Sequence, residues 1–211
     1  MAKKLNLVIV PVIAIGVIVG ILVGIGAFSI NAPTEYAAQY NCDYKLVSMA
    51  LDVNVVGANA NYNIHGEILS AYEDNLTMKN SNGDIVKVSA DDFNLISQNN
   101  HTIMSGNTVE YICDGKIKLF ADSYDVYDAD SNKIAYVSFN MIDTVGVMTD
   151  MNGNEIARYD SAALGYDYVV TIFDGCEMDD ESVLMIFASY VSDRKADSSS
   201  SGSSSSHRSS N

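Results

Sequence analysis

The sequence has few of the residues on which most catalytic sites are built. It contains three histidines, no Gly-x-Ser-x-Gly motif and no local pairing of a cysteine with a histidine, so an activated nucleophile is not predicted. The three cysteines, Cys42, Cys113 and Cys176, are far apart and form no Cys-x-x-Cys motif, which argues against a zinc site. In an exported protein two of them can form a disulfide, and buried free thiols are the alternative.

Positive charge is also scarce. The chain has 12 lysines and arginines against 27 aspartates and glutamates, a formal net charge of −15. Nucleic acids and anionic lipid surfaces both require a cationic face, so neither is an expected partner. The acidity favours solubility or a cationic partner such as a metal ion, and a solvated acidic surface is the simpler of these explanations.

The N-terminal segment is predicted to be a membrane anchor. The run from Leu7 to Phe28 is apolar and uncharged, and about 20 such residues span a bilayer as a helix. Lys3 and Lys4 precede it, which places the N-terminus in the cytoplasm and the bulk of the chain outside. A cleaved signal peptide is the alternative, although its apolar region is usually only about 7–15 residues long. We therefore expect an anchor at residues 1–30 and a stalk at residues 31–43.

Three glycines recur at every fourth position of this predicted membrane helix: Gly16, Gly20 and Gly24. Small residues at this spacing let two helix backbones approach closely. The pattern predicts a homodimer formed through the membrane helix. The alternative is that glycine is simply common in membrane helices.

The body of the chain has the pattern of short strands. Runs rich in Val, Ile, Tyr and Thr are separated by turn residues, and no long amphipathic helix interrupts them. The clearest strands are Ile85–Val88, Thr108–Ile112, Lys116–Phe120 and Tyr168–Phe173, and the clearest hairpin turns are Asn82-Gly83, Asp114-Gly115, Ser131-Asn132 and Asn152-Gly153. Such spacing indicates a sandwich or a barrel.

A hairpin pattern also repeats within the body. The segment Asp128–Val137 aligns without gaps with Asp150–Tyr159, and Lys79–Val88 is a looser third copy. Each copy is predicted to form strand, polar turn and strand. Because the copies are irregularly spaced, they indicate a repeated hairpin and not a solenoid.

The stretch Ser182–Val191 is apolar on every side. Acidic residues precede it, and Arg194 and Lys195 follow it, an order that suits a helix dipole. A helix at about 181–192 is too short to span a bilayer and must be enclosed by protein, which favours a barrel closed around it. The Ser- and Gly-rich tail at 196–211 is predicted to be disordered.

The repeated units ending in Ile-Ala, the run Gly165–Phe173 and the apolar terminal helix together resemble the LURP-one-related family of the tubby C-terminal-like and phospholipid-scramblase-like superfamily. This resemblance implies a mainly β fold, a closed antiparallel barrel of about twelve strands around a C-terminal hydrophobic helix. Here the barrel is expected at residues 44–195, preceded by one transmembrane helix.

Two functions follow from the resemblance. The first is a non-enzymatic, membrane-anchored binding or structural module that contacts an unidentified protein or the cell envelope. The alternative is a scramblase-like lipid-handling protein that depends on calcium. The phosphoinositide binding of tubby relatives is not carried over, because the basic residues Lys116, Lys118, Lys133 and Arg158 are scattered among acids.

Two acidic segments are candidate calcium sites. Scramblase-like relatives are thought to bind calcium close to the terminal helix, where this chain has Asp174, Glu177, Asp179, Asp180 and Glu181. The alternative is that these acids complement the positive end of the helix. Asp128-x-Asp130-x-Asn132 also begins like a calcium loop, but Lys133 and Phe139 replace its glycine and its bidentate glutamate, and a turn explains the same residues. No other cofactor is expected.

Overall fold

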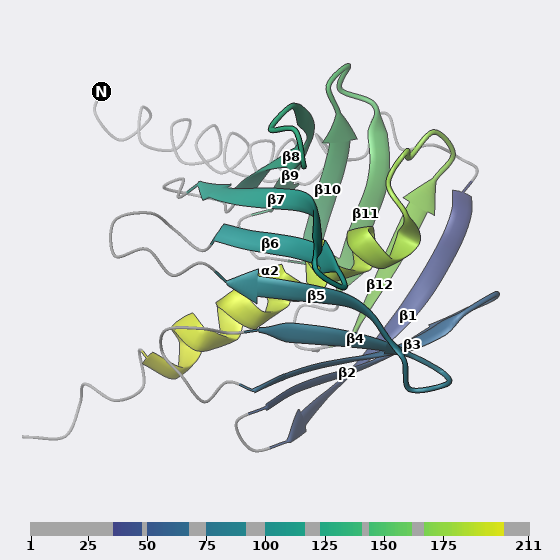
Figure 1. The fold of residues 1–211 in the computed structure, drawn as a ribbon, viewed down its shortest axis with the longest axis vertical. Helices are drawn as coiled ribbons and strands as arrows, with labels where there is room; N and C mark the ends of the chain where they lie inside the picture. Colours follow the sequence, from purple (N-terminus) through teal and green to yellow (C-terminus); the bar gives the residue numbers. More distant parts are fainter. Residues whose placement is uncertain are drawn as a thin grey trace, which may run out of the picture. The chain divides into compact units, whose positions relative to one another are not determined.

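A computed structural model describes residues 36–47, 50–67, 75–91, 100–116, 123–140, 144–161 and 167–200. Over these residues the chain forms one antiparallel β-barrel with a C-terminal helix (Figure 1). The elements are β1 (Tyr36–Val47), β2 (Ala50–Gly57), β3 (Asn61–Glu67), β4 (Leu76–Asn80), β5 (Ile85–Asp91), β6 (Asn100–Ser105), β7 (Thr108–Lys116), β8 (Ser123–Asp128), β9 (Lys133–Phe139), β10 (Val145–Asp150), β11 (Glu155–Ser161), β12 (Tyr168–Phe173) and α2 (Asp180–Ser200).

Each strand of the barrel pairs with the strand that follows it in sequence. The twelfth strand returns to the first, with Cys42 opposite Tyr168 and Tyr36 opposite Phe173, so the sheet closes on itself. The predicted mainly β fold, a closed antiparallel barrel of about twelve strands, is confirmed. Closure leaves no free sheet edge along most of the wall.

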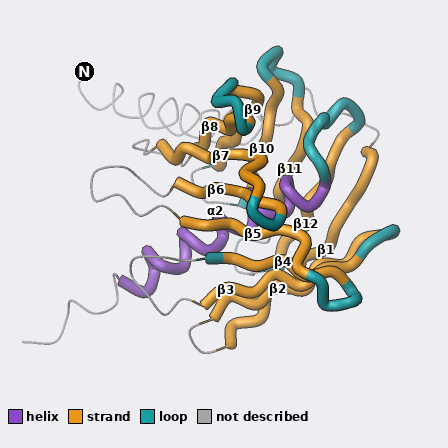
Figure 2. The backbone as a smooth tube through the Cα atoms, in the orientation of Figure 1, coloured by secondary structure: helices purple, strands orange, loops and turns teal. Residues whose placement is uncertain are grey.

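Helix α2 lies inside this barrel and forms its core together with the inward side chains of the strands (Figure 2). Every residue of the helix from Ser182 to Asp193 is buried. The rings of Tyr190 and Phe139 stack with 9° between their planes, and Phe187 meets Phe139 edge to face. Burying such large side chains contributes roughly 1.5–3 kcal/mol each as an upper figure. The helix therefore takes the place that a ligand occupies in a hollow barrel.

The predicted limits of the barrel need two corrections. Residues 36–43, assigned to a stalk, belong to β1, which begins at Tyr36. Its outward residues are polar while Tyr40, Cys42 and Tyr44 point into the core, so the segment is too polar on average to stand out as a strand. Helix α2 extends to Ser200, beyond the predicted end at about residue 192. A helix that packing has already nucleated continues through residues of moderate propensity until glycine or proline stops it.

One predicted turn is also wrong. Asp114 and Gly115 lie within β7, paired with Asn100 of β6 and with Tyr124 of β8 respectively. The β6–β7 hairpin instead turns at Gly106, whose φ is +59°. Cross-strand pairing on both sides of β7 outweighs the local turn preference of an Asp-Gly pair.

The repeated hairpin is confirmed as a shared turn geometry. In the turns after β8 and β10, the side-chain oxygen of Asp128 or Asp150 accepts hydrogen bonds from two backbone N–H groups, and Asn80 does the same after β4. Each turn then places one residue in the left-handed region: Gly83, Ser131 or Gly153. Asp128 therefore has the turn-forming role that the sequence analysis gave as the alternative to a calcium loop.

The predicted anchor at residues 1–30, with Gly16, Gly20 and Gly24, lies outside the described residues, as does the tail beyond Ser200. In the part of the chain that the structure describes, no helix is both long enough and apolar enough to cross a membrane.

Candidate functional site

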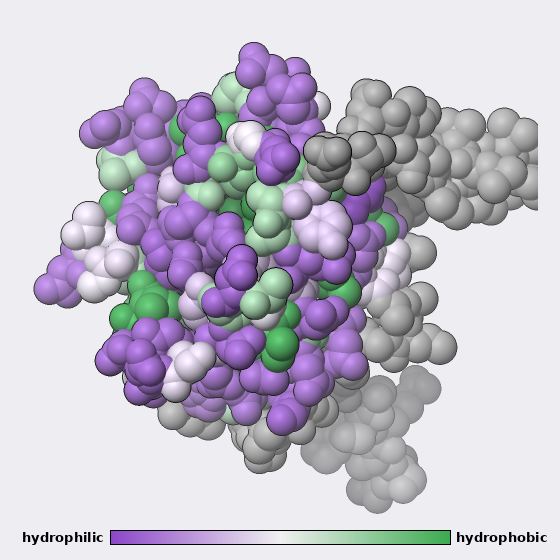
Figure 3. All heavy atoms as spheres, turned by 90° about the vertical axis from the view of Figure 1, so that its right-hand side faces the viewer, coloured by the Kyte–Doolittle hydropathy of each residue, from purple (hydrophilic) through white to green (hydrophobic). Residues whose placement is uncertain are grey.

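Because consecutive strands of the barrel run in opposite directions, alternate connections between them lie at the same end. The short turns after β2, β4, β6, β8 and β10 all lie at the end where α2 enters after β12; this is the hairpin end. In Figure 1 the turns after β2 and β4 and the connection from β12 to α2 lie toward the right-hand side, and Figure 3 faces that side. The face of the molecule seen in Figure 3 is mainly hydrophilic, with apolar residues in small, separate patches.

Two tyrosines of the barrel wall hold the first turn of α2. Tyr40 donates a hydrogen bond to Asp180 and Tyr62 donates one to Glu181, each at 2.6 Å. The two rings are neighbours, with centroids 6.3 Å apart. Burial, followed by the adjacent carboxylates, raises the pKa of both tyrosines well above the ordinary value. Both hydroxyl groups therefore stay protonated and act as hydrogen-bond donors.

Asp179 is the N-cap of α2. Its side chain accepts hydrogen bonds from the backbone N–H and the hydroxyl group of Ser182, both at 2.9 Å. It also forms an ion pair with the buried Lys87 at 3.1 Å, and Lys87 forms a second ion pair with Glu110. Burial alone would raise the pKa of Asp179, but the Ser182 hydrogen bonds and Lys87 outweigh it and lower the pKa. The interpretation of this acid as a helix-start residue is confirmed.

The structure divides the five predicted calcium ligands into two groups. Asp179, Asp180 and Glu181 are engaged by Lys87, Ser182 and the two tyrosines, whereas Asp174 and Glu177 are exposed in the turn before the helix. Within the described residues, no three acidic, histidine or cysteine side chains come together in a group able to hold a metal ion. The calcium site stays a prediction, and a cation bound there has to compete with these internal partners.

A second polar cluster lies at the opposite end of the barrel and was missed by sequence reasoning. Asp193 of α2 accepts hydrogen bonds at one oxygen from Tyr124, at 2.6 Å, and pairs with His101 Nε2 at 2.9 Å. All three are buried. The partners are 69 and 92 residues from Asp193 in the chain, so no local pattern signals them. The cluster fixes the far half of the helix against β6 and β8.

The thiol groups are free and poorly suited to catalysis. Cys113 lies opposite His101 in the β6–β7 ladder, but burial raises the pKa of its thiol to about 12. Burial raises the pKa of Cys42 to about 12 as well, and it also raises that of the partly exposed Cys176. A nucleophilic thiolate needs the opposite shift. All three cysteines are free in the structure, with Cys42 and Cys113 buried and Cys176 partly exposed.

Three basic residues of the wall, Lys116, Lys133 and Arg158, form ion pairs with buried carboxylates of the barrel. Lys116 and Lys133 both pair with the buried Asp125, and Arg158 contacts Glu155 at 2.9 Å. These pairs compensate buried carboxylates locally: Lys116 and Lys133 at Asp125, and Arg158 at Glu155. These three bases do not form a cluster that could bind a phosphate group.

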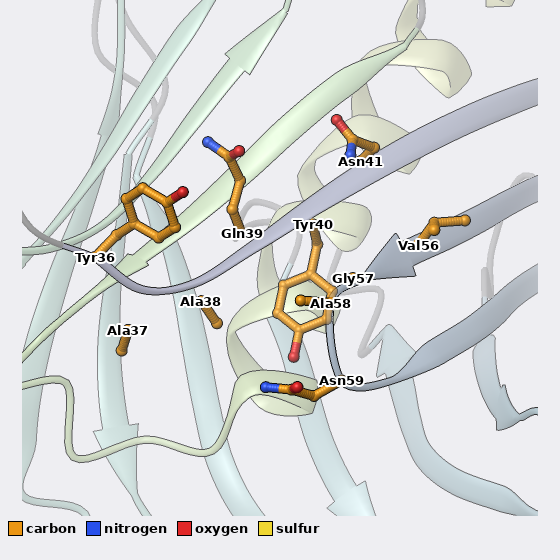
Figure 4. Close-up of a pocket in the computed structure, with 10 residues that line it drawn as sticks. All are labelled: Tyr36, Ala37, Ala38, Gln39, Tyr40, Asn41, Val56, Gly57, Ala58 and Asn59. Carbon is orange, nitrogen blue, oxygen red and sulfur yellow. The ribbon is translucent and has the colours of Figure 1, made fainter.

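Among the cavities lined by residues that the structure describes, two lie on the surface of the barrel beside β1. One, of about 390 Å³, lies where β1 diverges from the β2–β3 turn and is shown in Figure 4. The other, of about 320 Å³, lies over β1 and β12 beside Asp43, Asp160 and Asp167. Burial raises the pKa of Asp160, and Asp167 accepts a hydrogen bond from the backbone N–H of Tyr44. The first cavity is uncharged and the second is acidic.

Comparison of the chain with known protein families, curated proteins and solved structures finds no significant match.

Proposed function

We propose that this protein is a membrane-anchored, extracytoplasmic, non-enzymatic module that binds a partner or holds a structural position in the envelope. The observation that carries the proposal is the occupied lumen: α2 fills the interior of the barrel with its own buried side chains from Ser182 to Asp193. A helix inside a barrel occupies the space that a hollow barrel offers to a lipid or substrate. Binding is then a property of the outer wall and the ends.

The clusters at both ends of α2 support this proposal. At the hairpin end, Tyr40 and Tyr62 donate hydrogen bonds to the two acids of the first turn of α2. At the other end, His101 and Tyr124 bind Asp193. Each of these titratable side chains helps to hold α2 inside the barrel. Such satisfied networks rigidify a scaffold, and a rigid scaffold suits recognition of a partner.

The membrane location is tested with two measurements on intact cells. The full-length protein is expected to resist extraction by alkaline carbonate, since an apolar run of this length inserts as a helix. A Met151→Cys variant, at a turn residue that is 57% exposed, is expected to react with a membrane-impermeant maleimide added outside the cells. Carbonate-soluble protein, or labelling only after lysis, would contradict the anchored and extracytoplasmic arrangement.

The binding role is tested by crosslinking in the native membrane. A specific partner is expected to co-purify with the wild-type protein and to be absent from a matched preparation carrying Ile186→Asp, which disrupts the core. Reconstituted protein is expected to show no lipid transfer between vesicles with or without calcium. Calcium-dependent transfer, lost on neutralising the acids at 174–181, would assign the scramblase-like function instead.

A further inference from the structure

The first residues of β1, Tyr36–Gln39, have a strand beside them on only one side. Towards β12 the pairing begins at Tyr36, opposite Phe173. Towards β2 it begins only at Tyr40, opposite Gly57. Among the residues that the structure describes, no strand pairs with Tyr36–Gln39 on the β2 side, so the otherwise closed wall has a short open edge here.

The opening is built into the sequence of β2. At Gly57 the chain turns away from β1, and the Gly57 N–H donates to the Ala60 carbonyl at 3.0 Å. The Tyr40 ring stands where a side chain at position 57 would lie, because a Cβ atom there would be 2.4 Å from Tyr40 Cε1. Glycine at position 57 therefore allows Tyr40 to reach Asp180 and, at the same point, ends the β1–β2 ladder.

The open edge coincides with the 390 Å³ cavity, which we name the β1 notch and define by its lining residues, Tyr36–Asn41 and Val56–Asn59. Successive residues of a strand point to opposite faces, so a cavity that touches six consecutive residues lies at the edge of the strand. Figure 4 shows this arrangement, with Gln39 and Asn41 on one side of the β1 ribbon and Ala38 and Tyr40 on the other. A ligand in the notch meets the backbone of β1 together with both of its faces.

The chemistry of the notch favours a polypeptide. Alternate residues of an antiparallel strand direct their N–H and C=O groups to the same side, so Tyr36–Gln39 presents backbone donors and acceptors to the notch. No charged side chain lines it, which disfavours an ionic ligand. Of the two tyrosines that line the notch, Tyr40 is only 4% exposed, whereas Tyr36 is 58% exposed and offers one aromatic ring to a bound segment. Natural edge strands are usually guarded by lysine or proline, and Tyr36–Gln39 contains neither.

We propose that the β1 notch binds an extended, uncharged polypeptide segment of a partner protein, which adds a strand to β1 between Tyr36–Gln39 and the β2–β3 turn. This proposal rests on the proposed binding function and names the surface and the kind of partner. Backbone hydrogen bonds to β1 supply the affinity. The absence of charged lining residues selects against ionic segments.

The test uses the full-length protein in nanodiscs and a random dodecapeptide library displayed on phage. Selection is expected to enrich uncharged peptides with strand-like alternation. Ala58→Trp places a large ring in the notch at an exposed position and is expected to weaken binding of the enriched peptides at least tenfold. Met151→Trp, in the exposed β10–β11 turn, is the matched control and is expected to bind as the wild type does.

Hydrogen exchange of the backbone amides supplies a second readout. Bound peptide is expected to slow exchange at alternate amides of Tyr36–Gln39 and to leave the β10–β11 turn unchanged. The proposal is overturned if no peptide is enriched, if Ala58→Trp binds equally well, or if those amides gain no protection. It is also overturned if neutral oligosaccharides bind the notch instead, or if copies of the protein associate through it. A partner still captured in native membranes would then show that the module binds elsewhere.

Discussion

At the scale of single residues, the three related hairpins differ in the residue that occupies the left-handed position of the turn, which is serine in one and glycine in the other two. Ser131 adopts φ of 66° in the place where Gly83 and Gly153 adopt 86° and 85°. The left-handed region costs a residue with a Cβ roughly 1 kcal/mol, while glycine enters it freely. The β8–β9 turn therefore carries a local strain that its two counterparts lack.

Exchanging these residues is expected to move stability in opposite directions. Ser131→Gly should raise the free energy of unfolding by about 0.5–1 kcal/mol, and Gly153→Ser should lower it by a similar amount. Nothing lies within 4 Å of a Cβ built at Gly153, so the second variant reports the backbone alone. Denaturant titration of both variants measures the pair, and shifts of the same sign would contradict the explanation.

The charge of Asp179 is expected to make stability depend on pH on the acid side. Its pKa is lowered in the folded protein, so its contribution is complete above the ordinary value of about 4 and disappears as pH falls through the lower folded value. Asn is as good an N-cap as Asp, so Asp179→Asn removes only the charge facing Lys87. Because the Asp179 side chain is 39% exposed, solvent screens this pair, and the loss at pH 7 should be at most about 1 kcal/mol.

Thermal melts of wild type and Asp179→Asn between pH 7 and pH 2 test this expectation. The two curves should converge at the acid end of the range, where the wild-type carboxylate is protonated. Asp179→Ala also loses the N-cap, so its free energy of unfolding should be lower than that of Asp179→Asn by about 1 kcal/mol at every pH. A constant difference between wild type and Asp179→Asn across the range would show that the charge is not the cause.

At the scale of secondary-structure elements, α2 is the part of the fold on which the barrel depends most. Ile186 is 2% exposed at the middle of the buried stretch, and Ile186→Asp would place a carboxylate there without a partner. An unpaired buried charge costs several kcal/mol, so the variant is expected to lose cooperative thermal unfolding and near-ultraviolet circular dichroism. Met151→Asp, on an exposed turn, should change stability by no more than about 0.5 kcal/mol. Native-like melting of Ile186→Asp would mean that the helix is not the core.

The elements that sequence reasoning found and missed differ in how local their signals are. Ser182–Val191 is apolar in every direction, and this local property is enough to predict a buried helix. The turns at Asn82-Gly83 and Asn152-Gly153 are likewise set by their own residues. Asp114-Gly115 has the same local signal, but its neighbours in β6 and β8 keep it in a strand. Tertiary pairing decides between these cases, and a single sequence does not display it.

The candidate sites follow the same division. The acids before α2 were recognised as a helix start because the N-cap interaction of Asp179 with Ser182 is local. Their partners Tyr40, Tyr62 and Lys87 are distant from them in the sequence and were not predicted. The β1 notch arises from two strands of unequal length, since β1 starts four residues before its ladder with β2. The notch could be found only from the register of β1 with its two neighbouring strands, which the sequence alone does not give.

At the scale of the whole molecule, the predicted membrane helix should control association without affecting the barrel. If Gly20 lies at a contact between two such helices, Gly20→Leu separates the backbones and weakens the dimer. Crosslinking in native membranes is expected to give less dimer for Gly20→Leu than for the wild type or for Ile18→Leu, a change on the opposite side of the predicted helix. The melting temperature of the barrel should be equal in all three proteins. An undiminished dimer would remove the glycine stripe as an interface.

The order of the elements also bears on how the chain reaches its folded state. The strand that seals the wall and the helix that fills it are the last two elements to be made, at Tyr168–Phe173 and Asp180–Ser200. A growing or translocating chain can form neighbouring hairpins early, because each joins adjacent sequence, but it has nothing to wrap around. Ribosomes stalled before residue 180 should therefore carry protease-sensitive nascent chains, and resistance should appear only when the final twenty or so residues of the described chain have emerged. If the barrel lies outside the cytoplasm, as proposed, its export requires a machinery that accepts an unfolded chain.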